Sequence, residues 1–576
     1  MKGSDGCGQK DYLAEYEQIC RDFRWSEVAE ELHLGQKYNI AIEAVDHRAV
    51  GRRKQKAAFR FCNGNTEITV SYEELKNLTN QFANLLQGLK VRPGARVAVF
   101  LPPVPEFYVA FLGAVKAGAV AVPLSTALMS DALTEILEDS EASVVITSGI
   151  LNQRIKRDKL PSLRHVILVD RGSPAGAGSQ AEISFTETID YAESMAAASS
   201  AYAAQEYDPE DPMMLLYTSG STGKPKGVIH VHSGILHFYQ TGKLVLDLQP
   251  QDIYWCTSDP GWVLGISYGI WAPLLNGITS VIYAGEFNAD KWYEVLAKLR
   301  VNIWYTTPTA LRHLMNFGPD NPAKRYSLKS LRHILTVGEP LNPMVIRWSA
   351  QAFGLTVHDT WWMTETGGQI ICNLRCLPLK PGSMGRTIPG IEATVIDEQG
   401  RELQPLEVGQ LALKAGWPGM MRGIWKDEEK YREYFRWGTW YVTGDLAYRD
   451  AEGYFWFQGR VDDVIKKGSE RIGPFEVENK LAEHPAVMEA GVIGKPDPLW
   501  GEIIKAFVVL HPGFAWSKNL EAELQEFIQE RLGPHLVPWE IEARGSLPRT
   551  RSGKIMRRAL KALELGLPSA NLGEEE

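Results

Sequence analysis

The sequence has few cysteines for its length, and those it has are far apart. Only six of its 576 residues are cysteines. Small secreted domains that depend on disulfides carry a much denser framework of cysteines. We therefore expect unpaired, structural cysteines in a reducing compartment. The spacing Cys372-x₃-Cys376 offers half of a metal site, but no second Cys/His pair follows at ligand spacing. The six positions are Cys7, Cys20, Cys62, Cys256, Cys372 and Cys376.

A long helix-forming apolar run is also missing. The first 25 residues are rich in charge and lack the apolar core of a secretory signal peptide. Pro260–Gly285 carries no charge over the length of a membrane span, but glycines, Pro273 and Asn276 interrupt it. We predict a buried strand, a turn and a second strand there. The chain is expected to be soluble and cytoplasmic, with no membrane partner.

An excess of basic residues is absent as well. Lys and Arg number 61 against 70 Asp and Glu, a net charge of −9, which argues against a dedicated nucleic-acid binder. Charged residues make up 23% and aromatic residues 10%, values typical of folded proteins. At ~150 residues per domain, the length predicts about three or four core-sized units.

The hydrophobic pattern predicts an α/β fold. Helical spacing at Tyr72–Leu89, with Ser71 as N-cap, precedes strand patterns at Arg96–Leu101, Val120–Leu124 and Val144–Thr147. We predict a large N-terminal domain of helix-covered mixed or parallel sheets. Short strands and turns after about residue 385 predict a β-rich subdomain, and the last ~110 residues predict a small α+β domain. A low-complexity stretch at Ser173–Gln180 and Ala196–Ala204 is expected to be a surface connection.

A loop rich in glycine and hydroxyl groups follows one predicted strand. Tyr217–Val228 reads YTSGSTGKPKGV and carries Lys224 and Lys226. Glycine backbone, hydroxyls and N–H groups can surround phosphate oxygens, and the lysines supply positive charge. It is not a Walker A loop, because Thr218 and Pro225 occupy positions that need glycine and Ser or Thr. We interpret the loop as a polyphosphate site.

Three further segments carry candidate chemistry. Asp359–Gly368 (DTWWMTETGG) offers carboxylates and hydroxyls suited to Mg²⁺ or a nucleotide, although its tryptophans are equally typical of core packing. Tyr441–Asp445 (YVTGD) places an acid that could accept from ribose hydroxyls, and Gly459–Asp463 (GRVDD) follows it. Pro548–Arg558 (PRTRSGKIMRR) is a basic run in which Gly553 precedes Lys554, a pattern that favours a presented lysine over a smooth charged face.

Together and in this order, these segments resemble the acyl-adenylate-forming superfamily. Within it, DTWWMTETGG, YFWFQGRVDDVI, RIGPFEVENKL and EHPAVMEAGVIGKPD are most similar to the AMP-forming acetyl-CoA synthetases, particularly their shorter bacterial form. The resemblance implies an N-terminal domain over residues 1–461, with the β-rich subdomain at about 385–461. It implies a mobile C-terminal domain over residues 462–576, with a hinge at Asp462.

The resemblance also implies the reaction. Acetate would attack the α-phosphate of MgATP to give acetyl-AMP and pyrophosphate, and coenzyme A would then displace AMP to give acetyl-CoA. The C-terminal domain would rotate between the two half-reactions. Expected partners are thus acetate, ATP, Mg²⁺ and coenzyme A, in a monomer or small homo-oligomer. Lys554 resembles the lysine that is reversibly acetylated in this family, which implies a lysine acetyltransferase and deacetylase as further partners.

Roles of individual residues follow from the same resemblance. Lys554, Thr364, Glu365 and Arg471 are the expected catalytic residues, with Thr364 at the α-phosphate and Glu365 at Mg²⁺. Asp445 and Arg460 would bind ribose, and Gly468 and Ser469 would meet coenzyme A. The expected phosphate ligands are Thr218, Ser219, Gly220, Ser221, Thr222, Gly223, Lys224 and Lys226. The expected adenine site is Gly338, Glu339, Pro340, Asp359, Thr360 and Trp361, and Trp362 and Met363 are further expected cofactor-binding residues. A structural cation is expected at the carbonyls of Ala482, His484 and Val487.

The acyl pocket is expected to be short. Its implied lining is Trp262, Val263, Leu264, Val337 and Trp362, and the Trp362 indole would close it behind acetate. Leu264 replaces a threonine usual in the acetate enzymes, and Gly468-Ser469 reverses their usual order. Three alternatives stay open: a propionyl-, branched- or medium-chain acyl-CoA synthetase, an adenylation enzyme that loads a carrier protein, and a non-catalytic nucleotide-binding protein.

Overall fold

The computed structural model describes residues 9–63, 66–170, 187–219, 225–315, 325–468, 470–549 and 555–566. Within these ranges no helix is both long enough and apolar enough to cross a membrane. The predicted surface connection at Ser173–Gln180 lies outside them. Its second part, Ala196–Ala204, begins in the last turn of the short helix α7 and lies on the surface, where Asn80, Gln81 and Asn84 donate hydrogen bonds to its backbone carbonyls.

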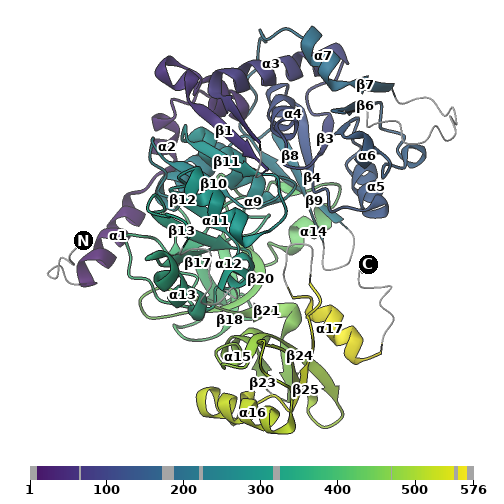
Figure 1. The fold of residues 1–576 in the computed structure, drawn as a ribbon. Helices are drawn as coiled ribbons and strands as arrows, with labels where there is room; N and C mark the ends of the chain where they lie inside the picture. Colours follow the sequence, from purple (N-terminus) through teal and green to yellow (C-terminus); the bar gives the residue numbers. More distant parts are fainter. Residues whose placement is uncertain are drawn as a thin grey trace.

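An eight-stranded sheet organises the first part of the chain, in the order β19-β9-β8-β4-β3-β5-β6-β7 (Figure 1). Its central strands are parallel and fully buried, whereas β9 and β19 are antiparallel. This agrees with the predicted helix-covered mixed sheet. The strands are β3 (Arg96–Phe100), β4 (Val120–Leu124), β5 (Val144–Thr147), β6 (His165–Leu168), β7 (Glu187–Asp190), β8 (Pro212–Ser219), β9 (Pro225–Val231) and β19 (Gly423–Ile424).

A nine-stranded sheet follows, in the order β16-β15-β14-β13-β12-β10-β11-β1-β2. Strands β10 to β14 and β1 are parallel, and β2, β15 and β16 join in antiparallel pairs. The strands are β1 (Ala57–Cys62), β2 (Glu67–Ser71), β10 (Ile253–Cys256), β11 (Thr279–Tyr283), β12 (Ile303–Thr306), β13 (His333–Val337), β14 (Val357–Trp361), β15 (Ile371–Cys372) and β16 (Arg386–Thr387).

Helices cover both sheets. Ser71 caps α3 as predicted: its hydroxyl accepts from the Glu74 backbone N–H, and the Glu74 carboxylate accepts from the Ser71 N–H. These helices are α1 (Gln9–Asp22), α2 (Trp25–Glu31), α3 (Tyr72–Gly88), α4 (Pro105–Lys116), α5 (Ser130–Asp139), α6 (Gly149–Asn152), α7 (Tyr191–Ala197), α8 (Gly234–Leu244), α9 (Val263–Ile266), α10 (Ala272–Leu275), α11 (Ala289–Lys298), α12 (Pro308–Met315) and α13 (Pro343–Phe353). Shorter helical turns are η1 (Ile42–Asp46), η2 (Gly51–Gln55), η3 (Arg157–Lys159) and η4 (Ser267–Trp271).

One sequence prediction is wrong in its first half. Pro260–Gly285 contains a strand only at its end, in β11, because Val263–Leu275 forms the continuous helical run α9, η4 and α10. This run is buried on every side, so its apolar residues show no helical period. The π-helical turn of η4 carries Tyr268 and Trp271 into the core.

A four-stranded antiparallel sheet forms the β-rich part, in the order β17-β18-β20-β21. Its strands are β17 (Ala393–Ile396), β18 (Gly409–Lys414), β20 (Trp440–Arg449) and β21 (Phe455–Arg460). Helix α14 (Glu428–Glu433) lies between β19 and β20 in the sequence. This sheet is the last layer before the chain enters the C-terminal lobe.

The C-terminal lobe is small and separate in outline, and its green and yellow elements lie at the bottom of Figure 1. Its own buried core packs α15 and α16 against a five-stranded sheet. The strands are β22 (Ile465–Lys467), β23 (Glu470–Ile472), β24 (Val487–Asp497), β25 (Gly501–Leu510) and β26 (Glu540–Ala543). The helices are η7 (Val461–Asp463), α15 (Pro474–Leu481), α16 (Lys518–Leu532), η8 (Pro534–Leu536) and α17 (Arg557–Glu564).

One buried carboxyl in the nine-stranded sheet has a consequence for stability. Asp359 in β14 accepts a hydrogen bond from the Thr336 hydroxyl of β13 at 3.0 Å and is 8% exposed. Burial raises the pKa of Asp359 to about 8, although the Thr336 hydrogen bond opposes the shift. The Asp pKa in an unfolded chain is about 3.9. The folded state therefore binds the Asp359 proton more tightly than the unfolded chain does.

The stability linked to Asp359 should fall as the pH rises from about 4 toward about 8. We expect Asp359→Asn to be more stable than the unaltered protein at about pH 8, with a difference that shrinks by at most ~1.4 kcal/mol per pH unit on acidification. Denaturant unfolding across this range measures it, with the exposed Asp158→Asn as the matched control. A difference that does not change with pH would contradict the prediction.

Candidate active site

The predicted site residues gather where parallel strands end. Strands β10, β12, β13 and β14 are parallel neighbours, so the segments that follow their carboxyl ends meet at one edge of the sheet. This edge is where open α/β sheets bind ligands. The segments there include Trp262–Leu264 after β10, Gly338–Pro340 after β13, and Trp362–Gly368 after β14.

The phosphate loop is described only at its two ends. Thr218 and Ser219 end β8, and Lys226 lies in β9, with Thr218 and Lys226 opposite each other in the antiparallel pair. Gly220, Ser221, Thr222, Gly223 and Lys224 lie outside the described residues. Burial and the neighbouring Lys430 lower the pKa of Lys226, and Glu365 opposes that effect. Lys226 and Glu365 are thus close, although they are far apart in the sequence.

The Gly338-Glu339-Pro340 turn is held against α12. Gly338 has φ +97°, a backbone conformation that L side chains rarely adopt. The Glu339 carboxylate accepts hydrogen bonds from the Thr309 backbone N–H at 2.9 Å and from Arg312 Nη2 at 2.6 Å. Its side chain is therefore an anchor for the turn. The predicted adenine contacts in this turn remain available from its backbone.

An ion pair joins the ribose candidates. The β20–β21 register places Asp445 opposite Arg460, and Arg460 Nη1 donates to Asp445 Oδ1 at 2.7 Å. Trp361 Nε1 donates to the other carboxylate oxygen, Oδ2, at 2.9 Å. Burial alone would lower the pKa of Arg460, but the Asp445 carboxylate raises it. Three predicted residues from two different sheets are thus in direct contact.

Glu365 has the surroundings of a cation ligand. Among the described residues, its carboxylate has a weak polar contact with Tyr434, whose hydroxyl lies 3.5 Å from Oε1, and a hydrogen bond with its own backbone N–H. Burial raises its pKa, and Arg460 and Lys226 lower it. Mg²⁺ in nucleotide sites is commonly held by one or two carboxylates together with the phosphates. A carboxylate with few protein hydrogen bonds, near the predicted phosphate loop, fits that pattern. The described residues hold no cluster of three or more His, Cys, Asp or Glu at metal-binding distance.

Two residues near Glu365 were not predicted from the sequence. Tyr434 faces the Glu365 carboxylate, and Lys430 on α14 is close enough to lower the pKa of Lys226. Lys430 also pairs with Glu433 at 2.5 Å. Both lie in an ordinary charged helix and the turn after it, so no local sequence signal distinguishes them.

The segment Trp362–Gly368 is a tight turn in which glycine is required. The Thr366 hydroxyl accepts from the Met363 N–H at 2.9 Å and closes the turn. Gly367 has φ +75°, and a Cβ there would lie 2.0 Å from the Gly419 carbonyl oxygen. A Cβ on Gly368 would lie 2.8 Å from the Tyr268 hydroxyl. This packing fixes Thr364 and Glu365 at the edge of the sheet.

The predicted acyl pocket residues lie in one apolar cluster. Leu264, Val337 and Trp362 are buried in the main hydrophobic core, and Val263 is partly buried against that core. Trp262 is the half-buried N-cap residue of α9. The Trp362 indole is 7% exposed, and its Nε1 donates to the Tyr305 hydroxyl at 2.9 Å. The Tyr268 ring packs edge-on against it, with centroids 5.1 Å apart. The Trp362 side chain is thus held in place by Tyr305 and Tyr268, so that it can act as the predicted wall of the acyl pocket.

The C-terminal candidates are only partly described. Gly468 has φ +59° and donates its N–H to the Trp500 carbonyl at 2.7 Å. Ser469 lies outside the described residues, as does Lys554. Arg471 lies in β23 opposite Lys466, and its side chain is not described. Asp462 lies exposed in η7.

The residues that flank the lysine segment are paired with each other. Arg549 and Ile555 form an antiparallel β-bridge, and Arg549 makes an ion pair with Glu489 of β24. Burial, Arg549 and Arg312 lower the pKa of His313 on α12. The C-terminal lobe therefore brings Arg549 near α12, the helix that anchors Glu339. Arg557 also pairs with Glu478 and Asp463, which ties α17 to the residue after Asp462.

The predicted structural cation involves the turn after α15. Ala482, His484 and Val487 surround this turn, where the His484 carbonyl already accepts from the Val487 N–H at 2.9 Å. His484 Nε2 lies 3.1 Å from a Glu523 carboxylate oxygen. The expected carbonyl ligands are therefore brought close in sequence and space, and the ion itself stays a prediction.

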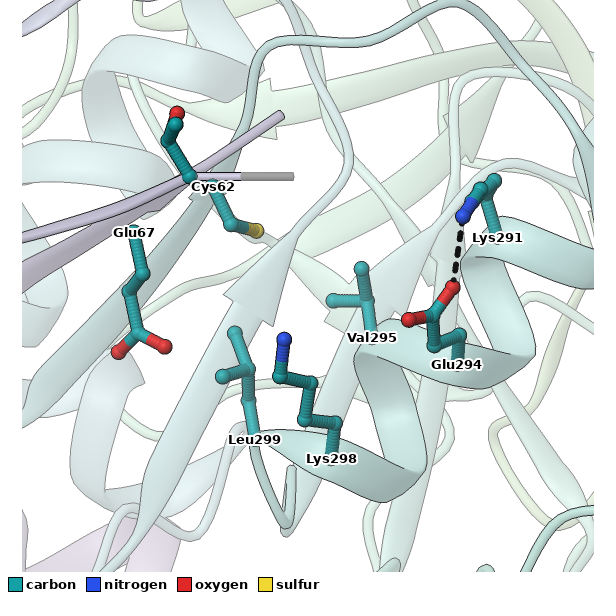
Figure 2. A pocket seen from close by; sticks show the side chains of 8 residues that line it. Cys62, Glu67, Lys291, Glu294, Val295, Lys298 and Leu299 are labelled. Atoms are coloured by element: carbon teal, nitrogen blue, oxygen red, sulfur yellow. Dashed lines mark hydrogen bonds and ion pairs between the residues drawn. The ribbon is translucent and has the colours of Figure 1, made fainter. Parts of the chain in front are cut away.

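A small pocket elsewhere is lined by Cys62 and Glu67 of the β1–β2 pair and by one face of α11 (Figure 2). Lys291 pairs with Glu294 at 2.9 Å. Lys298 lies at the other end of α11, beside Leu299 (Figure 2). Burial raises the pKa of the Cys62 thiol to about 11, so it is protonated at neutral pH. None of the predicted site residues line this pocket.

Comparisons with known proteins agree with this geometry. The family model for AMP-binding enzymes matches residues 46–425, and the model for the AMP-binding enzyme C-terminal domain matches residues 476–554. The chain is 52% identical over 567 residues to an acetyl-coenzyme A synthetase of Bacillus subtilis (strain 168), covering 98% of this chain and 97% of that protein. An acetyl-coenzyme A synthetase of Rubrobacter xylanophilus is 38% identical, with 96% and 92% covered.

Solved structures share the fold over nearly the whole chain. A Brucella canis acyl-CoA synthetase is 32% identical with a TM-score of 0.74, covering 96% of this chain and 99% of that one. The anthranilate CoA ligase AuaEII in complex with anthranoyl-AMP is 29% identical with a TM-score of 0.82, covering 95% and 100%. The fold, the grouped site segments and these similarities lead to one conclusion: the chain belongs to the AMP-binding enzyme family.

Proposed function

We propose that this protein is an AMP-forming acetate–CoA ligase, which converts acetate, ATP and coenzyme A to acetyl-CoA, AMP and pyrophosphate through acetyl-AMP. The observation that carries the proposal is the 52% identity, over 98% of the chain, to an acetyl-coenzyme A synthetase. The Trp362 wall is the feature of the site that favours acetate over larger acids.

The first half-reaction needs positioning and charge neutralisation. An acetate oxygen attacks the α-phosphorus of ATP, the new C–O–P linkage forms, and the bond to the pyrophosphate oxygen breaks. No protein nucleophile is required, so the chain acts by aligning two anions. Asp445 and Arg460 hold the ribose, Trp361 and the Gly338–Pro340 turn hold adenine, and Thr364 and Lys226 meet the phosphates.

Charge at the phosphates is balanced by two sources. Glu365 would hold Mg²⁺, which supplies positive charge between the phosphate oxygens. The residues of the chain supply the rest: Lys226 lies near Glu365, Lys430 lies near Lys226, and Lys554 bridges acetate and the nucleotide in our proposal. Charge that develops in the transition state is stabilised by such fixed cations.

In the second half-reaction the coenzyme A thiolate attacks the acetyl carbonyl carbon, and AMP leaves with the electrons of the C–O bond. We propose that the C-terminal domain, residues 462–576, rotates about Asp462 to replace Lys554 with the Lys467–Arg471 loop. The exposed position of Asp462 in a short turn between two lobes supports a hinge there. The Arg557–Asp463 pair couples that turn to α17.

The remaining assignments are proposals of the same kind. A structural cation binds the carbonyls of Ala482, His484 and Val487. The protein acts in the cytoplasm as a monomer or small homo-oligomer. Leu264 makes the pocket more apolar, which supports some use of propionate. Loading of a carrier protein has less support, because the two relatives compared above are both acetyl-coenzyme A synthetases.

The proposed preference for acetate over longer acids can be tested by replacing Trp362. We expect the unaltered protein to release pyrophosphate with acetate, more slowly with propionate and barely with longer acids. Trp362→Gly should raise kcat/KM for butyrate and pentanoate by about tenfold or more, because each excluded methylene is worth ~1–3 kcal/mol. Pyrophosphate release with C2 to C8 carboxylates, with and without coenzyme A, measures both. An unchanged chain-length profile in Trp362→Gly would sink the pocket assignment.

The role of Lys554 can be separated by half-reaction. Acetylation would remove its charge, so acetylated protein and Lys554→Gln should lose adenylation by about 100-fold or more and keep thioester formation from supplied acetyl-AMP. Arg558→Ala, a neighbouring exposed cation, is the matched control. Equal loss of both half-reactions would count against the role. Treatment with a lysine deacetylase should restore adenylation to the acetylated protein.

A further inference from the structure

A polar layer lies directly behind the Trp362 wall. The Tyr305 hydroxyl accepts from Trp362 Nε1 at 2.9 Å and lies 2.6 Å from the Thr360 hydroxyl. The Tyr268 hydroxyl accepts from the Gln369 backbone N–H at 2.7 Å and lies 3.0 Å from the Thr241 hydroxyl. The surroundings of the Trp362 indole therefore include hydroxyl groups as well as the edge of the Tyr268 ring.

Gln369 is the exception in this layer. It is fully buried, at 0% exposure, and neither Oε1 nor Nε2 of its amide has a hydrogen-bond partner among the described residues. The amide approaches the Tyr305 hydroxyl without a well-formed hydrogen bond, and this weak contact opposes the large rise that burial causes in the Tyr305 pKa. Its backbone is held on both sides, since His237 Nε2 bonds its carbonyl at 2.8 Å.

A buried amide without partners is costly, and its donor and acceptor stay available to a polar guest. The nearby His237 does not satisfy them, because its Nε2 is used by the Gln369 carbonyl, and burial lowers its pKa to about 4 so that it is neutral. The space behind Trp362 thus rejects an alkyl chain for two separate reasons. One is the bulk of the indole, and the other is the desolvated amide beyond it.

We propose that Gln369 is a second specificity-determining residue of the acyl pocket: Trp362 limits the length of the acyl group, and the Gln369 amide sets the polarity of the space behind it. Removing the indole alone would open a pocket suited to acyl chains that carry an ether or carbonyl oxygen. Apolar chains would be accepted fully only when the amide is replaced as well. This inference rests on the proposed acyl-CoA ligase function.

The test uses two acids of the same shape. Hexanoate and 4-methoxybutyrate differ only by an ether oxygen in place of one methylene, and neither can form a lactone. In Trp362→Gly we expect kcat/KM to favour 4-methoxybutyrate by about fivefold or more, because the Gln369 Nε2 can donate to the ether oxygen. In Trp362→Gly/Gln369→Met the ratio should reverse in favour of hexanoate, a total change of about tenfold or more.

Methionine is the substitution of choice because it keeps the length of glutamine and removes only its polar atoms. Since the amide makes no well-formed hydrogen bond among the described residues, Gln369→Met alone should unfold at an equal or higher temperature. Trp362→Gly/Gln87→Met, which changes an exposed glutamine at the end of α3, is the matched control and should keep the ratio of Trp362→Gly.

Two outcomes would overturn the inference. One is the same ratio of the two acids in Trp362→Gly and in Trp362→Gly/Gln369→Met. The other is a Gln369→Met protein that unfolds at a clearly lower temperature, since the amide would then have structural partners. Failure of the proposed function is distinct: the unaltered protein would release no pyrophosphate with acetate, propionate or any other acid of the C2 to C8 series.

Discussion

The Asp445–Arg460 ion pair is the interaction on which the arrangement of the site depends. It is formed by adjacent antiparallel strands, so the register of β20 and β21 sets its geometry before any ligand arrives. Trp361 donates to the same carboxylate from the nine-stranded sheet. The pair therefore ties the β-rich sheet to the sheet edge that carries the nucleotide segments. Arg460 is also the last residue of β21 before the turn that leads to the C-terminal lobe.

The site combines buried acids with nearby cations. Burial raises the pKa of both Asp359 and Glu365, whereas Arg460 and Lys226 oppose the rise at Glu365. A polyphosphate with its magnesium ion would add charges of both signs to this recess, so the chain carries acids and bases within reach of each other. This local balance matters more for nucleotide binding than the net charge of −9.

The acyl pocket shows how one side chain can be made rigid by its neighbours. Trp362 is held by a hydrogen bond to Tyr305 and by the edge of Tyr268, which the π-helical turn of η4 carries into the core. A wall that cannot swing aside discriminates by bulk. Near it lie a layer of hydroxyls and the buried Gln369 amide, which in our proposal adds discrimination by polarity.

The sequence by itself determined the fold class and several of the strands and helices, because alternating patterns, the Ser71 cap and glycine-rich turns act locally. It also indicated the motif segments, since their polar and glycine content is unusual beside buried strands. It mispredicted Val263–Leu275, because a helix buried on all sides shows no period. Only the tertiary structure brought Tyr305 to Trp362, Tyr434 to Glu365 and Gln369 behind the wall. These contacts join residues that are distant in the sequence or carry no local signal, so packing alone decides them.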